Sequence, residues 1–537
     1  MFEVQNQPPP LEPYNLFASD TVLREAVARE QAGWAEDGLK ALGATLGKPE
    51  TIKLGFDANK YTPSLRTLDR YGHRVDEVEF HPAWHDLLAI ALRAGLHSSP
   101  WAEPKPGAHV ARATGFYLLM QIESGVCCPL AMTYGSVPTL RQAPDIAAQW
   151  LPKIYGHEYD RRFRPVGEKT AALIGMGMTE NQGGSDLRTN VTRAEPAGDG
   201  SFHLFGHKWF MSAPMCDAFL VLAQSSKGLS CFLMPRWMPD GERNAVHILR
   251  LKDKLGNRSN ASSEVEFEGA YAQLIGEEGR GIPTIIEMGN YTRLDCATGS
   301  SGLMRQALTQ ALHHARHRTV FQTKLIDQPL MENVLADLAL ETEAATVLTL
   351  RLARAYDEDD ELSLAYRRVV TPAAKFWICK RTPYVTFEAM EVLGGSGYIE
   401  ECVMPRLYRE APVNSIWEGS GNVMCLDVLR ALARTRGAAE MLAAELDDSG
   451  DRRLGAFVQR LRDRLQGAEH NDESQARALV RELVLALQAV LLIKHAPAAV
   501  ADAFCASRLE GDGGAAFGLM PRGIDARAII DRASPLS

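Results

Sequence analysis

The pattern of apolar and polar residues divides the chain into helical and β regions. Up to about residue 175, apolar residues recur with the 3.6-residue period of an α-helix, most clearly over 21–46, where Ser19 and Asp20 are candidate N-caps. From 176 to about 285 the apolar runs are short, alternating or β-branched, and turn-forming stretches such as 197–200 and 225–228 separate them. This middle region predicts a compact β unit, either a small barrel or two packed sheets.

Helical periodicity returns after Gly289. Segments around 293–319, 331–356, 366–393 and 422–434 predict a four-helix bundle, and a last region rich in Ala, Leu and Arg predicts a further helical module. The expected fold class is therefore α+β, mostly α. The expected domains are 1–175 (helical), 176–285 (β-barrel), 286–437 (helical bundle) and 438–537 (extra helical domain).

Composition narrows the functional classes. A net charge of −9 means that any binding of nucleic acid requires a local basic patch. The nine cysteines include no CxxC pair, which argues against a disulfide framework or a zinc site. The first residues lack the basic start and apolar core of a signal peptide, and the apolar run 483–493 is too short to span a bilayer. We expect a cytoplasmic protein with no bound metal and no membrane association.

The stretch 414–430 places one carboxylate, Glu418, between the indole of Trp417 and Gly419. A carboxyl group against an aromatic wall loses hydration, which raises its pKa and suits it to exchange a proton. The alternative is an acid that interacts with the positive end of a helix starting near Asn422. The stretch alone does not decide between these interpretations.

Two further stretches can contact a flat ligand. In the loop 178–186, Gly183 and Gly184 allow close backbone approach and Thr179 offers a hydroxyl, although Gly-Gly-Ser-Asp is also a common turn. In the predicted strand 207–214, Trp209 is either a core residue or a wall on which an aromatic cofactor stacks.

The stretch 313–321 combines histidines and arginines on one predicted helix. His313 and His317 have the spacing of a metal-binding pair, but no third ligand lies at a suitable distance in sequence. Arg318, followed by Phe321, is better interpreted as a phosphate-binding arginine with an aromatic support. Downstream, the glycines of 391–401 close a helix and permit contact with a ligand.

The order of these motifs, MTE-x-x-GGSD, KWF, R-x-x-F, LGGSGY and IWEGSGN, resembles that of the acyl-CoA dehydrogenase superfamily over about residues 80–435. The runs 251–267, 371–376 and 406–422, together with the extra C-terminal domain, are most similar to the alkylation-response flavoproteins of that superfamily. The resemblance implies an N-terminal helical domain, a middle β-barrel and a C-terminal bundle with FAD between them.

The resemblance also implies roles for individual residues. Glu418 matches the general base that removes the α-proton of an acyl-CoA thioester. Arg318 matches an arginine that reaches the FAD of a neighbouring subunit, which implies an oligomer, usually a homotetramer. The other implied FAD-binding residues are Met178, Thr179, Gly184, Ser185, Trp209, Phe210, Met211, Ser212, Gly394, Gly395, Trp417, Gly419, Ser420 and Asn422.

The chain departs from the family pattern at several of these positions. Trp417 replaces Tyr, Ser420 replaces Thr and Asn422 replaces Gln. Glu391 stands where many relatives have Gln, and Gln322 replaces a Gly. The flavin site is preserved in this pattern, whereas tight specificity for one acyl-CoA is not indicated.

Similarity to alkylation-response flavoproteins implies binding of double-stranded DNA through the C-terminal domain. In 451–466, apolar residues form one helix face, and Arg453, Arg460 and Arg464 line its flank. These arginines are either a solvated edge of a packed helix or a salt-sensitive, sequence-independent phosphate-binding stripe. The alternative function is a metabolic dehydrogenase of a short or branched acyl-CoA with no role on DNA.

Overall fold

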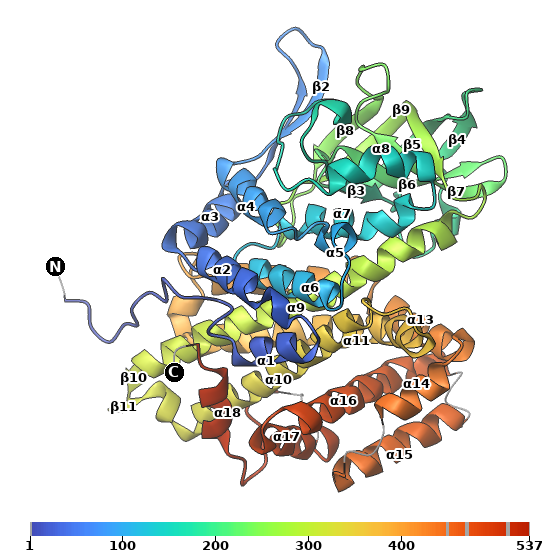
Figure 1. The fold of residues 1–537 in the computed structure, drawn as a ribbon. Coiled ribbons are helices and arrows are strands. Elements are labelled where there is room, and N and C mark those ends of the chain that lie inside the picture. The colour runs from blue at the N-terminus through green and yellow to red at the C-terminus, as the bar shows by residue number, and fades with distance from the viewer. Residues whose placement is uncertain (1–2, 447–449, 468–471, 512–515, 536–537) are drawn as a thin grey trace. The chain divides into compact units, whose positions relative to one another are not determined.

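The computed structural model describes residues 3–446, 450–467, 472–511 and 516–535. The chain forms two compact units, each assembled from separate segments (Figure 1). We call residues 50–104 and 122–292 the barrel unit, and residues 1–49, 105–121 and 293–537 the bundle unit.

The barrel unit is built around a seven-stranded sheet with the order β3-β6-β4-β5-β9-β7. Because β6 also pairs with β7, the sheet closes on itself as a barrel, and β8 pairs with β9. The prediction of a β unit in this region is confirmed. Its strands are β3 Ile174–Gly177, β4 Arg193–Pro196, β5 Phe202–Ser212, β6 Ala218–Ser225, β7 Gly228–Pro235, β8 Val246–Leu251 and β9 Ser262–Ile275.

Strands β6 and β7 supply much of the barrel core. Residues 218–223 of β6 and 230–235 of β7 are buried without the alternation of a sheet that faces water on one side. The two strands pair antiparallel from Ala218–Pro235 to Ser225–Gly228, so the chain turns at the predicted stretch 225–228.

Helices and a hairpin complete the barrel unit. The hairpin, β1 Ser64–Leu68 and β2 Arg74–Glu79, interrupts a region for which the sequence predicted mainly helices. The helices are α3 Pro49–Lys60, α4 Pro82–Arg93, α5 Ser99–Ala102, α7 Cys127–Leu140 and α8 Pro144–Ile154.

The bundle unit begins with α1 Thr21–Arg29, whose N-cap is the predicted Asp20: its carboxylate accepts a hydrogen bond from Leu23 N at 3.1 Å. The helical pattern predicted over 21–46 is divided between two helices. The chain adopts a left-handed conformation at Gln31 (φ 65°), which no helix accommodates, and α2 then runs from Glu36 to Leu46.

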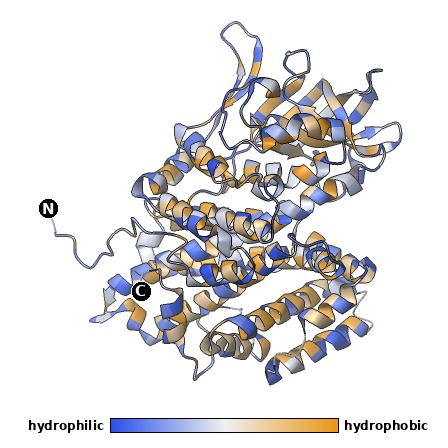
Figure 2. Cartoon of the chain, in the orientation of Figure 1, coloured by the Kyte–Doolittle hydropathy of each residue, from blue (hydrophilic) through white to orange (hydrophobic). Residues whose placement is uncertain are grey.

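Long helices make up most of the bundle unit, and α10, α11, α13 and α16 pack together (Figure 1). Figure 2 shows hydrophobic residues along α16, whose residues 483–492 are all buried. None of the helices in the described ranges is long and apolar enough to cross a membrane. The helices are α6 Ala108–Met120, α9 Gly281–His317 (from Arg293 onward in this unit), α10 Pro329–Arg354, α11 Glu361–Val392, α12 Met404–Glu410, α13 Gly421–Arg434, α14 Ala438–Glu445, α15 Arg452–Gln466, α16 Ala476–His495, α17 Ala498–Phe504 and α18 Ala526–Ala533.

One arginine joins distant segments of the bundle unit. Arg305 of α9 forms a 3.2 Å ion pair with Asp20 and donates hydrogen bonds to the carbonyls of Ser19 (3.0 Å) and Ala533 (2.8 Å). The start of α1 and the end of α18 are therefore held by the same buried side chain. The division into four domains stays a prediction.

Candidate active site

The glycine-rich loop 178–186 follows strand β3 in the barrel unit. Its Thr179 carbonyl accepts a hydrogen bond from Trp209 N at 2.8 Å, which ties the loop to β5. A Cβ on Gly184 would overlap Thr179 Oγ1, so only glycine fits there without displacing that hydroxyl. Ser185 lies exposed on the same loop. The loop thus brings together the hydroxyl and glycine positions that the sequence singled out.

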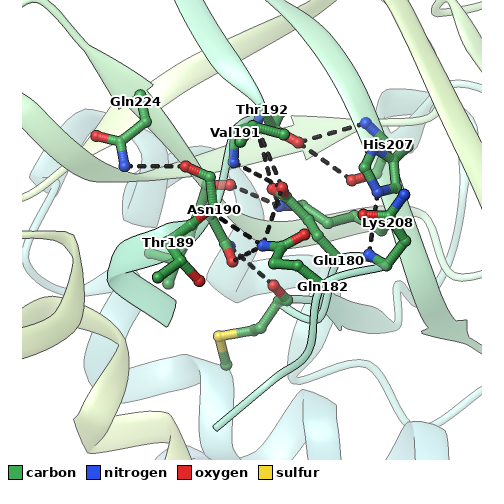
Figure 3. Close-up of polar contacts among 12 residues, drawn as sticks. Glu180, Gln182, Thr189, Asn190, Val191, Thr192, His207, Lys208 and Gln224 are labelled. Atoms are coloured by element: carbon green, nitrogen blue, oxygen red, sulfur yellow. Dashed lines mark hydrogen bonds and ion pairs between the residues drawn. The ribbon is translucent and has the colours of Figure 1, made fainter. Parts of the chain in front are cut away.

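A buried ion pair fixes this loop (Figure 3). Lys208 Nζ of β5 donates to Glu180 Oε1 at 2.7 Å and to the Leu222 carbonyl at 2.8 Å. The Glu180 carboxylate also accepts hydrogen bonds from the backbone N–H groups of Val191 (2.7 Å) and Thr192 (3.3 Å). One carboxylate therefore anchors both ends of the segment 180–192.

Burial is the main influence on both charges of this pair. It lowers the pKa of Lys208 to about 8, because water no longer stabilises the ammonium. Burial also acts to raise the pKa of Glu180, but the charge and hydrogen bond of Lys208 outweigh it and bring that pKa below its usual value. Both residues belong to sequence motifs, Glu180 to MTE and Lys208 to KWF, but the motifs do not show that the two side chains pair. The signal was a lysine inside an apolar strand and a glutamate inside the glycine-rich loop.

Side-chain amides complete the network in Figure 3. Asn190 Nδ2 donates to the Met178 carbonyl at 2.9 Å, and Gln182 Nε2 donates to Asn190 Oδ1 at 3.2 Å. Gln224 Nε2 of β6 donates to the Asn190 carbonyl at 3.0 Å. The backbone of Met178, at the start of the loop, is thereby fixed to the segment that ends it.

The predicted cofactor wall on β5 is irregular. The pairing of β5 with β9 shifts register between Lys208 and Met211, and Lys252 Nζ lies 3.7 Å from the ring centroid of Trp209 and 4.6 Å from that of Phe210. The Met211 side chain is fully buried, and Ser212 Oγ hydrogen bonds Ser262 Oγ at 3.0 Å. Trp209 and Phe210 offer ring surface on β5, whereas the buried Met211 presents no exposed surface to a ligand.

Glu418 lies in an unusual turn of the bundle unit. Its φ of 59° is in the left-handed region, and Gly419 follows with φ 100°. Trp417 Nε1 donates to Asn414 Oδ1 at 3.0 Å, and Asn414 Nδ2 donates to Ser300 Oγ at 3.1 Å, so the indole next to the carboxylate is anchored to α9. The N-cap residue of α13 is Ser420, with Asn422 exposed in the first turn. Glu418 therefore precedes the N-cap by two residues.

Arg318 and the glycines after α11 form two other parts of the bundle unit. Helix α9 ends at His317, so Arg318 lies just past it and donates to the Asn6 carbonyl at 2.7 Å. Phe321, at the tip of the hairpin β10 Thr319–Val320 and β11 Thr323–Lys324, is 94% exposed. Gly394 adopts φ 59°, and no atom lies within 4 Å of a Cβ built on it or on Gly395.

The residues predicted to bind FAD divide between the two units. Thr179, Gly184, Trp209 and Phe210 come together in the barrel unit. Hydroxyls, backbone N–H groups and large rings beside glycines are the chemistry that a flavin requires, so these residues fit FAD. Among the described residues, no group of three or more His, Cys, Asp or Glu side chains could hold a metal ion. His313 Nε2 instead hydrogen bonds the Pro9 carbonyl.

Comparisons with known proteins agree with this arrangement. Residues 6–161 match the model of the adaptive response protein AidB N-terminal domain, 175–270 match the acyl-CoA dehydrogenase middle domain and 279–433 its C-terminal domain. The "Putative acyl-CoA dehydrogenase AidB" of Escherichia coli strain K12 is 49% identical over 95% of each chain. The acyl-CoA dehydrogenase family member 11 of Caenorhabditis elegans is 31% identical over 72% of this chain and 64% of its own.

A solved structure extends the similarity to the whole fold. Caenorhabditis elegans ACDH-11 in complex with C11-CoA superimposes with a TM-score of 0.86 at 26% identity, covering 95% of this chain and 93% of that one. The sequence-based expectation of the family and of its fold class is confirmed. The chain belongs to the AidB branch of the acyl-CoA dehydrogenase family of FAD-dependent oxidoreductases.

Proposed function

We propose that this chain dehydrogenates an acyl-CoA thioester with Glu418 as the general base. The observation that carries the proposal is the Glu418 turn: a carboxylate held in a left-handed conformation beside an anchored indole, at the start of a helix of the bundle unit. When bound, FAD supplies the acceptor for the β-hydride. Glu418 takes the α-proton on a carboxylate oxygen, and Trp417 excludes water from that side of the carboxylate.

Replacement of the base tests this proposal. We expect Glu418→Gln to retain FAD but to lose acyl-CoA-dependent bleaching of the flavin by about 10²- to 10⁴-fold in rate, the usual contribution of a general base. The exposed Glu401 gives a matched control, Glu401→Gln, which should bleach like the wild type. If the wild type bleaches with no thioester from butyryl-CoA to lauroyl-CoA, Glu418 does not serve this reaction.

The active form is a homotetramer in this proposal. Support comes from Arg318, at the base of the hairpin β10–β11, and from Phe321 at its tip, whose ring is 94% exposed. An arginine and an exposed aromatic ring on one hairpin suit a contact with a second copy and with the pyrophosphate of its FAD. Sedimentation equilibrium of the holoprotein measures the oligomeric state directly. A monomer at micromolar concentration would contradict the proposed tetramer.

A second candidate function is sequence-independent binding of duplex DNA in the response to alkylation. Helix α15 supports it: Leu454, Phe457, Val458 and Leu461 are buried, and the exposed Arg460 lies over the Phe457 ring at 5.3 Å. Arg453 already pairs with Asp451 and Asp502, and Arg464 pairs with Glu482. To bind DNA, those two arginines would have to leave their carboxylates for phosphates. The support for a phosphate-binding stripe is therefore weaker than the sequence pattern indicated.

A salt titration decides the DNA proposal. If α15 binds phosphates, the affinity for a duplex falls steeply with salt, and replacing Arg453, Arg460 and Arg464 by Ala lowers both the affinity and the slope against salt. Equal binding by the variant removes α15 from the site. Absence of binding by the wild type at low salt leaves the metabolic dehydrogenase as the function. A cytoplasmic location belongs to the same proposal and is tested by cell fractionation.

A further inference from the structure

The turn that presents Glu418 requires support from its surroundings. Glu418 and Gly419 are both left-handed in succession, with φ of 59° and 100°. A side chain at positive φ is strained, and such a conformation persists only where neighbouring groups fix it. Glycine relieves the strain at 419 but not at 418.

Two cations hold this turn from two different helices. Arg293 Nε of α9 donates to the Glu418 carbonyl at 3.1 Å, and Lys375 Nζ of α11 donates to the Gly419 carbonyl at 2.7 Å. Arg293 is 8% exposed and Lys375 only 1%. Consecutive carbonyls of the turn are thus bonded to buried positive charges.

The two cations differ in their counter-charges. Arg293 Nη1 pairs with Asp427 of α13 at 3.0 Å, and Arg368 of α11 shares that carboxylate at 2.7 Å. Lys375, in contrast, forms no ion pair with any carboxylate in the described parts of the chain. A buried ammonium without a counter-charge costs free energy, so a nearby anion is required.

Glu418 is the candidate for that charge, because Lys375 binds the carbonyl of the residue that follows it. Burial raises the pKa of the Cys296 thiol well above its usual value, and on this thiol Lys375 and Glu418 act in opposite directions, Lys375 lowering the pKa and Glu418 raising it. The charges of Lys375 and Glu418 therefore both act on the buried Cys296 thiol of α9.

Other charges around the turn do not neutralise Lys375. Burial raises the pKa of both nearby thiols, so they remain uncharged at neutral pH. The positive charges around the turn therefore outnumber the one carboxylate of Asp427. In the described parts of the chain, the charged or titratable side chains around the turn are Arg293 and Cys296 of α9, Arg368, Lys375, Cys379 and Lys380 of α11, Asp427 of α13 and Arg477 of α16.

We propose that Lys375 is the positioning residue of the general base, holding the Glu418–Gly419 peptide in its left-handed turn and supplying the counter-charge that keeps the Glu418 carboxylate ionised. The inference rests on the proposed role of Glu418. It assigns the ionisation of the base to a group that does not touch the substrate.

A double-mutant cycle on thermal unfolding of the holoprotein tests the charge coupling without measuring activity. Lys375→Met, Glu418→Gln and the double variant are compared at pH 8. Adding the decreases in melting temperature of the two single variants gives the value expected without coupling. We expect the double variant to melt at least about 2 °C above that value, because removing both charges leaves neither without a counter-charge. Additive losses overturn the proposal, whether or not the wild type has activity.

The pH profile of flavin bleaching by butyryl-CoA and octanoyl-CoA gives the second readout. We expect Lys375→Met to raise the apparent pKa of the base by about one unit or more, since an opposite charge nearby favours the ionised form. Lys375→Arg should restore the profile of the wild type. Arg367→Met removes a positive charge from the same helix, paired at 3.9 Å with the 96% exposed Asp359, and should leave the profile unchanged.

The two experiments separate the possible failures. An unchanged profile in Lys375→Met contradicts the inference but leaves the proposed function intact. A wild type that bleaches with neither thioester contradicts the proposed function, while the thermal cycle still decides the coupling. If Lys375→Met yields no folded holoprotein, Lys375→Gln, which keeps a hydrogen-bond donor and lacks the charge, takes its place in both experiments.

Discussion

Lys208 Nζ lies 2.7 Å from Glu180 Oε1, and neither side chain is exposed to solvent. The pair joins strand β5 to the loop that precedes it and leaves no charge without a partner. A buried pair of this kind contributes little beyond well-packed apolar residues, but breaking it by removing one partner is costly. Its value lies in fixing one conformation of the loop 178–186.

Removal of Glu180 should destabilise the barrel unit strongly. We expect Glu180→Ala to lower the free energy of unfolding by about 3–5 kcal/mol, because Lys208 stays buried without its counter-charge. Urea denaturation of the holoprotein measures the loss. Glu195→Ala breaks the exposed pair of Glu195 with Arg193 on β4 and should cost less than about 1 kcal/mol. Equal losses in the two variants would show that burial does not govern this pair.

A single methyl group on the glycine-rich loop should weaken FAD binding. Ala at position 184 overlaps Thr179 Oγ1, so the hydroxyl or the loop must move. We expect Gly184→Ala to raise the Kd for FAD by about tenfold, equivalent to about 1.4 kcal/mol. Fluorescence titration of the apoprotein gives the value. Gly38→Ala on α2, where no atom lies within 4 Å of the new Cβ, should bind FAD like the wild type.

Acid should destabilise the bundle unit through His109. Burial, with the charges of Arg112 and Arg367, lowers the pKa of His109 from 6.5 to about 3. Between pH 6.5 and about 3, the unfolded chain binds a proton at this histidine that the folded chain does not. The free energy of unfolding therefore rises with pH in this range, and it falls by at most about 1.4 kcal/mol for each pH unit of acidification. Urea denaturation at several pH values in this range should show a smaller decrease in the free energy of unfolding for His109→Gln than for the wild type. His203→Gln, at an exposed histidine, should follow the wild type, and parallel curves for all three proteins would exclude His109 as the cause.

Loss of the exposed ring at the hairpin tip should change assembly and leave folding intact. Phe321 is 94% exposed, so Phe321→Ala should alter the free energy of unfolding by less than about 0.5 kcal/mol. We expect the same variant to sediment as a smaller species and to release FAD more readily. Leu330→Ala, at an 85% exposed leucine, is the matched control. An unchanged sedimentation coefficient for Phe321→Ala would place the subunit contact elsewhere.

The sequence predicted the elements whose pattern is local. Turn residues and buried runs located the β6–β7 hairpin, and the acid before α1 located its N-cap. The hairpin 64–79 was missed because its strands are short and polar, and distant contacts hold it: Arg74 donates to the Ile248 carbonyl of β8. The break at Gln31 carries no glycine or proline signal at that residue.

Among the residues of the candidate site, too, local motifs indicated some, while others act from distant positions in the sequence. Motifs located Glu418, Trp417 and the loop 178–186, because their neighbours in sequence are also their neighbours in space. Arg293 acts on Glu418 from 125 positions away, a relationship that no periodicity or spacing encodes. Lys375, inside a long helix, could not be distinguished from any other helical lysine before its burial was known.

The interleaving of the two units has a consequence for the order in which they form during synthesis. The barrel unit is complete once residue 292 has emerged, since it uses only residues 50–104 and 122–292. The bundle unit needs its last helix, because Arg305 bonds the carbonyls of both Ser19 and Ala533. During synthesis, the apolar faces of α1, α2 and α6 therefore remain incompletely covered until several hundred further residues have been made. A chaperone that binds nascent chains would find its targets in these early helices, while the barrel unit beside them in sequence is already able to fold.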